Sequence, residues 1–142
     1  MKKIILITKI IFIYFLFSQN VFSSSKDYFN VGKDLFDKKE YEKSKILFER
    51  DIIFNPKSTR SYLYLSKIFN IKDNEEEESI NLNNALLLDP VNDEAIYLLT
   101  LLKIKRSDYD SAKELIEKFD LVCDSFCSKS EELRSKLDKI TP

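Results

Sequence analysis

Apolar residues recur along this chain with the spacing of amphipathic helices, and the whole pattern returns every 34 residues. Each unit opens with a large apolar residue, has a second one three positions later, and has a small residue directly after that. These triplets are Tyr28, Val31 and Gly32, then Tyr62, Leu65 and Ser66, then Ile96, Leu99 and Thr100. Because positions three and four apart share one face of a helix, each unit predicts a helix with an apolar stripe.

The second half of each unit predicts another helix that ends at a turn. Runs rich in apolar residues at 51–54 and 85–88 are followed by Pro56 and Pro90, which lie 34 residues apart. Proline cannot continue a helix, so it ends the second helix and fixes the turn to the next unit. The expected architecture is therefore three helical hairpins, at about 25–58, 59–92 and 93–126. An ordinary helical bundle is the alternative, but it leaves the register of the small residues and prolines without a cause.

This pattern resembles the tetratricopeptide repeat (TPR), in which aromatic-x2-Leu-Gly-x2-Tyr is followed by Ala-x3-Phe and then by Pro within about 34 residues. The matching residues of the first unit are Tyr28, Val31, Gly32, Leu35, Ser44, Phe48 and Pro56. The resemblance covers roughly residues 25–127. It implies an all-α fold, a short α-solenoid of about three TPR-like hairpins plus a C-terminal capping helix.

The later units depart from the TPR pattern. In the second unit Glu75 and Glu78 stand where an aromatic and a small residue belong, so the helix within 73–88 is expected to be shifted by about one residue or to start late. The third unit is the most degenerate, as expected for a terminal repeat that lacks a neighbour on one side. The segment 128–140 then predicts the capping helix, with Ser128 or Ser130 at its start.

The run of four glutamates at 75–78 has two interpretations. Consecutive residues of a helix point in directions about 100° apart, so four of them do not converge on one cation. We favour a solvated first turn, where the helix dipole attracts negative charge and Asn74 or Asp73 caps the helix. A calcium site is the alternative, but its oxygen ligands normally come from a turning loop.

The N-terminus predicts a secretory signal peptide at 1–23. Three lysines accompany a short apolar run, Ile4 to Phe17, and Val21, Phe22 and Ser23 form the expected cleavage region. The run is shorter than the roughly 20 residues that span a bilayer comfortably. An uncleaved membrane anchor is the alternative. The mature chain, 24–142, is expected to be one helical repeat domain in the periplasm or an equivalent space.

Composition argues against catalysis and against nucleic acid as partner. The chain has no His, no Trp, one Gly and two Cys, which removes the usual catalytic triads, His-based acid–base chemistry and Gly-rich phosphate loops. We expect no cofactor and no metal, because two thiols without His do not complete a common zinc site. The mature chain carries a net charge of about −4 and no basic stripe. A carboxylate-based hydrolase remains the enzymatic alternative.

The two cysteines, Cys123 and Cys127, lie between the third unit and the capping helix. In an oxidising compartment an even number of cysteines favours a disulfide. Here it would constrain the connection between the third unit and the capping helix. Two free thiols and a redox-active pair are the alternatives, although the spacing is not that of C-x-x-C.

The TPR resemblance implies a binding module, because the first helices of TPR proteins line a concave groove that holds a peptide or a partner's helix. The chaperone-binding members grip a carboxylate with Lys and Asn residues, but the matching positions here hold Phe29, Lys33, Tyr64, Glu94 and Leu98, so that clamp is absent. The segment 96–104 is apolar on nearly every face and needs a cover: a partner, a second copy of the chain, or the C-terminal helix. The expected groove residues are Phe29, Lys33, Phe36, Leu63, Tyr64, Lys67, Asn70, Tyr97, Leu101 and Ile104.

Overall fold

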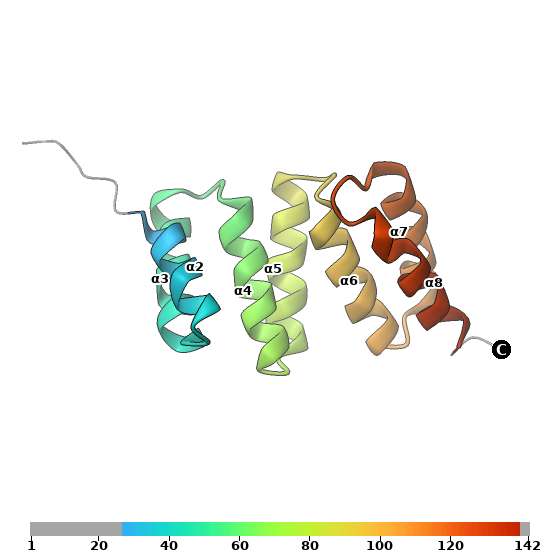
Figure 1. The fold of residues 1–142 in the computed structure, drawn as a ribbon, viewed down its shortest axis with the longest axis horizontal. Coiled ribbons are helices and arrows are strands. Elements are labelled where there is room, and N and C mark those ends of the chain that lie inside the picture. Colours follow the sequence, from blue (N-terminus) through green and yellow to red (C-terminus); the bar gives the residue numbers. More distant parts are fainter. Residues whose placement is uncertain (1–26, 140–142) are drawn as a thin grey trace, which may run out of the picture.

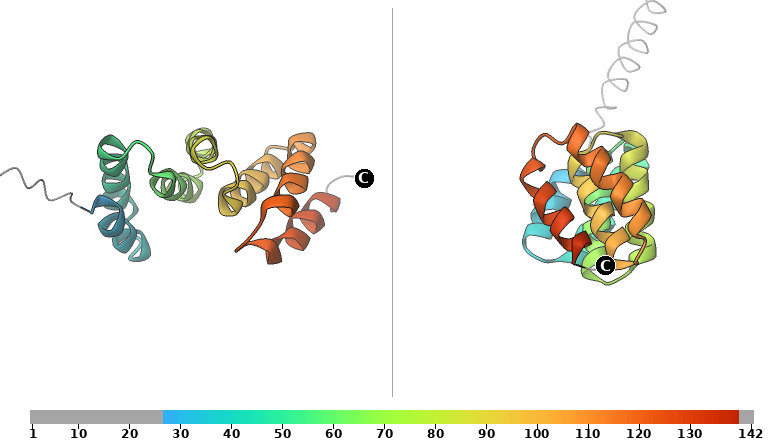
Figure 2. Two further views of the ribbon diagram at one scale, coloured as in Figure 1. Left: turned by 90° about the horizontal axis from the view of Figure 1, so that it is seen from above. Right: turned by 90° about the vertical axis from the view of Figure 1, so that its right-hand side faces the viewer.

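The computed structural model describes residues 27–139, and these residues form an all-α solenoid. The helices are α2 (Tyr28–Asp37), α3 (Tyr41–Phe54), α4 (Thr59–Ile71), α5 (Glu75–Leu88), α6 (Asp93–Lys105), α7 (Tyr109–Val122) and α8 (Ser130–Asp138), with a short 3-10 helix, η1 (Cys127–Lys129), before α8. Seen from above, α2, α4, α6 and α8 lie on one side of the stack and α3, α5 and α7 on the other (Figure 1 and Figure 2). The predicted signal peptide lies outside the described residues.

The hairpins repeat with the predicted period in their turns as well as in their helices. The second helices α3, α5 and α7 begin 34 residues apart and have 14 residues each. Each hairpin turn holds one residue in the left-handed region, at φ 62° for Lys39, 55° for Asp73 and 58° for Ser107. The expected shift of the second helix is wrong: α5 begins in register at Glu75, and the side chain of Asn74 caps it by accepting a hydrogen bond from the Glu77 N–H.

The hydrophobic core runs between the repeats as well as within them. Phe48 of α3 clusters with Leu65 and Ile68 of the next repeat, and the equivalent residues pack in the same way around α5 and α6. Each first helix therefore covers the second helix of the repeat before it. This shared burial is what gives a repeat protein its stability, because no single hairpin buries its own apolar face.

The first repeat has a solvated outer face. Val31 is 53% exposed, whereas the residues one and two repeats later, Leu65 and Leu99, are 4% and 5% exposed. Polar Asp34 stands where Ile68 occupies the next repeat, fully buried. The sequence of α2 thus fits a helix with no hairpin packed before it within the described part of the chain.

The C-terminal helix α8 supplies the cover that the apolar α6 needs. Leu133 and Leu137 of α8 are buried in one cluster with Ile96 and Ile104 of α6 and with residues of α7. The solenoid thus ends in a capping helix, and neither a partner nor a second copy is needed on that side of α6. The expected serine cap is wrong, because Ser130 is the first residue of α8 and its Oγ donates to Asp120 instead.

We expect Lys39→Gly to stabilise the protein by about 1 kcal/mol, because an L-residue in the left-handed region costs roughly that much and glycine does not. Urea unfolding of the variant against the natural chain measures the change. Lys38→Gly is the matched control, because Lys38 has φ −82° in the same turn. Lys38→Gly should bring no gain, and equal stabilisation by both variants would contradict the prediction.

Candidate partner-binding surface

Three of the ten expected groove residues belong to the core. Phe29 and Leu63 are each 6% exposed and Ile104 is 9% exposed. Phe29 clusters with Phe48, Leu63 with Leu82, and Ile104 with residues of α7 and α8. These side chains support the first-helix side of the solenoid from within and do not offer a surface to a partner.

Aromatic rings form a partly exposed wall between α2 and α4. Tyr64 lies at its centre, with its ring centroid 5.1 Å from those of Phe36 and Phe48. Phe36 also meets the edge of Tyr41 at 5.4 Å. Aromatic pairs at such separations contribute about 0.5–1.5 kcal/mol beyond their area burial. Of the expected groove residues, Phe36 and Tyr64 are thus brought together, half-buried, in a rigid setting.

The two lysines of the expected groove are paired within the chain. Lys33 Nζ lies 2.6 Å from Asp37 Oδ2, and this hydrogen bond raises the pKa of Lys33. Lys67 Nζ lies 2.6 Å from Glu94 Oε1 and 4.5 Å from the centroid of the Tyr64 ring. Each lysine carries its own counter-charge, so this side does not present unpaired positive charge at these two positions.

Asn70 forms hydrogen bonds with a buried carboxylate, that of Glu78. Its side-chain amide donates to both oxygens of Glu78, at 3.0 and 3.1 Å. Glu78 is 3% exposed, because it occupies the position that Ser44 and Ala112 fill in the other repeats, where two helices approach closely. Burial raises the pKa of Glu78, against the opposing effect of the Asn70 hydrogen bond. Asn70 thus has a structural role that the sequence pattern did not indicate.

Tyr97 and Leu101 lie on α6 next to the capping helix. The hydroxyl of Tyr97 donates to Glu132 Oε1 of α8 at 3.1 Å, and its ring centroid lies 5.9 Å from that of Phe126. Both residues are partly buried against the cluster that α8 completes. At the C-terminal end of the solenoid, α8 therefore covers part of the surface of these two expected groove residues.

The glutamate run divides into residues with different roles. Glu75 forms ion pairs with Lys105 at 2.9 Å and Arg106 at 3.1 Å, which tie α5 to the end of α6. Glu76 is exposed and Glu77 half-buried in the first turn, as predicted for a charged helix start. Glu78 is the exception, since it is buried. Within residues 27–139 no group of three or more His, Cys, Asp or Glu side chains is arranged to hold a metal ion.

The sulfur atoms of Cys123 and Cys127 lie at disulfide distance, 2.12 Å apart. The loop that they close folds over the start of α6, where Asp93 Oδ2 accepts hydrogen bonds from the N–H groups of Asp124, Ser125 and Phe126 at 2.9, 2.7 and 2.8 Å. Partial burial acts to raise the pKa of Asp93, but these three donors outweigh it and the pKa is lowered. No pattern in the sequence indicated this link, which fixes where the chain turns into α8.

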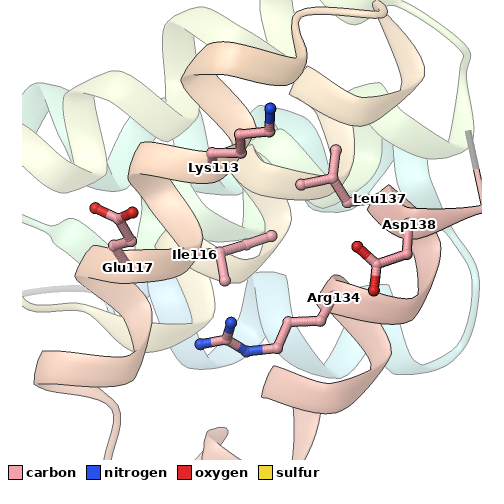
Figure 3. Close-up of a pocket in the computed structure, with 6 residues that line it drawn as sticks. All are labelled: Lys113, Ile116, Glu117, Arg134, Leu137 and Asp138. Atoms are coloured by element: carbon pink, nitrogen blue, oxygen red, sulfur yellow. The ribbon is translucent and has the colours of Figure 1, made fainter. Parts of the chain in front are cut away.

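A small cavity of about 240 Å³ lies between α7 and α8, as Figure 3 shows. Its floor is formed by apolar Ile116 and Leu137, and its rim carries charges of both signs. This volume is below the roughly 300–1,000 Å³ of typical small-molecule sites, so we assign it no ligand. The six lining residues are Lys113, Ile116, Glu117, Arg134, Leu137 and Asp138.

The fold is that of TPR domains. No protein-family model and no curated protein matches the chain. The TPR2B domain of yeast Sti1, solved in a complex with pHsp70, has a TM-score of 0.70 and 20% identity, with 78% of this chain and 92% of that chain covered. The Sgt2 TPR domain from Aspergillus fumigatus has a TM-score of 0.68 and 20% identity, with 82% of this chain and 81% of that chain covered.

A third similar structure is the first TPR of Spaghetti (RPAP3), solved with the HSP90 peptide SRMEEVD. Its TM-score is 0.71 at 12% identity, and the match covers 80% of this chain and 92% of that chain. Likenesses at such low identity concern the fold. The fold therefore defines the class of protein as a helical-repeat protein with TPR architecture.

Proposed function

We propose that this protein is an exported, non-enzymatic interaction module that binds a peptide or a partner's helix along the first-helix side of its solenoid. The observation that carries the proposal is the half-buried aromatic wall of Phe36 and Tyr64, with Lys67 held over the Tyr64 ring. Rigid aromatic side chains beside a fixed cation are the kind of anchors that dominate interface energies. TPR structures solved with pHsp70 and with an HSP90 peptide support a peptide-like partner.

The chemistry of this surface favours a partner that does not depend on a carboxylate clamp. Lys33 and Lys67 already have internal counter-charges, in Asp37 and Glu94. An acidic partner would have to displace them. A largely apolar or uncharged segment that stacks on the aromatic wall would leave both ion pairs in place. The interaction is then expected to depend only weakly on salt.

We expect Lys67→Glu to weaken binding of the partner about tenfold. The substitution places a new carboxylate beside that of Glu94, so two negative charges lie next to the aromatic wall. The partner is first captured from the native envelope with the natural chain, and its affinity for each variant is then measured by calorimetry. Lys45→Glu is the matched control, because Lys45 has a similar exposed fraction, an ion pair with Glu49 and a contact with the Phe69 ring, but lies on the second-helix side. Equal losses for both variants would place the binding surface elsewhere.

Export is the second part of the proposal, and it rests on the apolar run Ile4 to Phe17 and the residues after it. We expect mass spectrometry of the native protein to find a chain that begins near Ser24. A full-length chain in the membrane fraction would instead support the alternative, a membrane-anchored subunit of an envelope assembly.

The same compartment determines the state of the two cysteines. Alkylation of the denatured, unreduced protein should label neither Cys123 nor Cys127, because an oxidising compartment keeps them paired. Labelling of both thiols would argue against the oxidising compartment.

A further inference from the structure

Large apolar side chains stand exposed at one repeated position of the solenoid. Ile53, Leu87 and Leu121 are 71%, 80% and 85% exposed, and each is the last residue but one of its helix, α3, α5 or α7. Single exposed apolar residues are ordinary on protein surfaces. Here the same position is exposed and aliphatic in three consecutive repeats, which folding alone does not require, since such side chains add little to the core.

These three residues lie on the same edge of the molecule. Helices α3, α5 and α7 run in the same direction, so their C-terminal ends meet one edge of the stack, the upper edge in Figure 1. Phe54 and Val91, 73% and 59% exposed, belong to the same helix ends and connections. We call Ile53, Phe54, Leu87, Val91 and Leu121 the edge row.

The edge row is also where the N-terminal segment joins the domain. Tyr28, the first residue of α2, stacks its ring on Phe54 with centroids 5.5 Å apart. Ten residues, 18–27, separate Tyr28 from the apolar run Ile4 to Phe17. Ten residues span at most about 35 Å. Where that run is retained as an anchor, the alternative to cleavage named above, this short segment keeps the edge row within about 35 Å of the bilayer, and the inference below rests on that alternative.

We propose that the edge row rests on the surface of a lipid bilayer, with its aliphatic side chains in the boundary between headgroups and acyl chains. Side chains that enter this boundary gain from the removal of apolar area from water. The connections along the edge contribute two lysines, Lys57 and Lys129, and two acidic residues, Asp89 and Asp124. The edge therefore has no surplus of positive charge, and we expect attachment by apolar burial to zwitterionic lipid, not by attraction to anionic lipid. None of the helices in 27–139 is long and apolar enough to cross a membrane.

Tryptophan reporters test this proposal directly, because the chain has no Trp of its own. Leu87→Trp and Leu121→Trp place a reporter in the edge row of the full chain. Ile80→Trp is the matched control, since Ile80 is 47% exposed on the same helix as Leu87 but two turns away from the edge. Each protein is mixed with phosphatidylcholine vesicles that carry brominated acyl chains. We expect at least twofold quenching and a blue shift for the two edge reporters, and neither for Ile80→Trp.

A second set of variants removes the row around the reporter. In the Leu87→Trp background, Ile53→Ser with Leu121→Ser should reduce the quenching several-fold, whereas the control change Ile46→Ser should leave it intact, because Ile46 lies away from the edge on α3. Circular dichroism confirms that each variant is folded. Absence of quenching at both edge positions, or equal quenching at all three, would overturn the proposal. A blue shift of the edge reporters that grows with protein concentration in the absence of vesicles would also overturn the proposal, because it would indicate that a second copy of the chain covers the edge row. The edge is separate from the aromatic wall, so either result leaves the groove experiment unaffected.

Discussion

Gly32→Thr should destabilise the protein by roughly 1 to 3 kcal/mol, the usual cost of adding side-chain volume to a well-packed core. A Cβ on Gly32 would lie 3.0 Å from Cε1 of the Phe48 ring and 3.3 Å from Cβ of Leu47. Thr has a slightly better helix propensity than Gly, but that gain of a few tenths of a kcal/mol is too small to offset the clash. Urea unfolding measures the change.

The repeats themselves suggest the compensating variant. The residues at the two seam positions are Gly32 with Phe48, Ser66 with Leu82, and Thr100 with Ile116. The smallest first-helix residue, Gly32, lies opposite the largest second-helix residue, Phe48, whereas the larger Ser66 and Thr100 lie opposite the smaller Leu82 and Ile116. Phe48→Ile in the Gly32→Thr background should therefore recover about 1 kcal/mol or more relative to the sum of the single changes. Ser66→Thr, opposite the smaller Leu82, is the control and should cost little. A double variant whose loss equals the sum of the two would contradict this steric account.

Glu78→Gln should stabilise the protein at pH 7 by roughly 1 to 3 kcal/mol, because an ionised carboxylate that is 3% exposed loses its hydration while Asn70 supplies only part of the replacement. Gln keeps the shape and can still accept from Asn70. The sign of the pH dependence follows from the raised pKa of Glu78. Between the ordinary Glu pKa, roughly 4.3, and the raised folded value, the folded state binds more protons than the unfolded state.

The natural chain should therefore lose stability relative to Glu78→Gln as pH rises through that window, and keep a constant deficit above it. Other carboxylates of the chain have lowered pKa values, among them those of Glu75 and Asp93, and they act in the opposite direction. These other carboxylates are the same in both proteins, so their contributions cancel in the difference between the two free energies of unfolding. Unfolding experiments at a series of pH values from about 4 to 8 measure it. If this difference in free energy of unfolding is independent of pH, or shrinks as pH rises, burial does not control the pKa of the Glu78 carboxyl.

Much of the fold could be predicted because its determinants are local. The helical period of residues such as Leu65 and Leu99, the small residues of the seam, and Pro56 and Pro90 all act within one hairpin or between neighbours. The start of α5 was the exception. Glu78 in a small-residue position suggested a shifted helix, but the cap at Asn74 and the turn at Asp73 held the register, and the chain accommodated the carboxylate by burying it against Asn70.

The candidate site was less predictable, because exposure is set by neighbours that are distant in sequence. Phe29, Leu63 and Ile104 have the pattern of groove residues, yet packing from other helices buries them. The pairing of charges follows the same rule: no local pattern indicates a counter-charge for Lys67, but Glu94, which is 27 positions later, lies 2.6 Å away. A single sequence contains the residue types of such pairs but not their distances.

The sequence by itself determined the number of hairpins, the end of the second helix before Pro56 and before Pro90, and the residue types that the chain lacks, since periodicity, turn residues and composition do not depend on how the helices pack. Only the tertiary structure decided that α8 covers α6, that Asp93 binds the loop between Cys123 and Cys127, and that Leu87 and its equivalents stay outside the core. The physical reason is that burial depends on how successive hairpins stack, and stacking brings together helices that no local pattern relates.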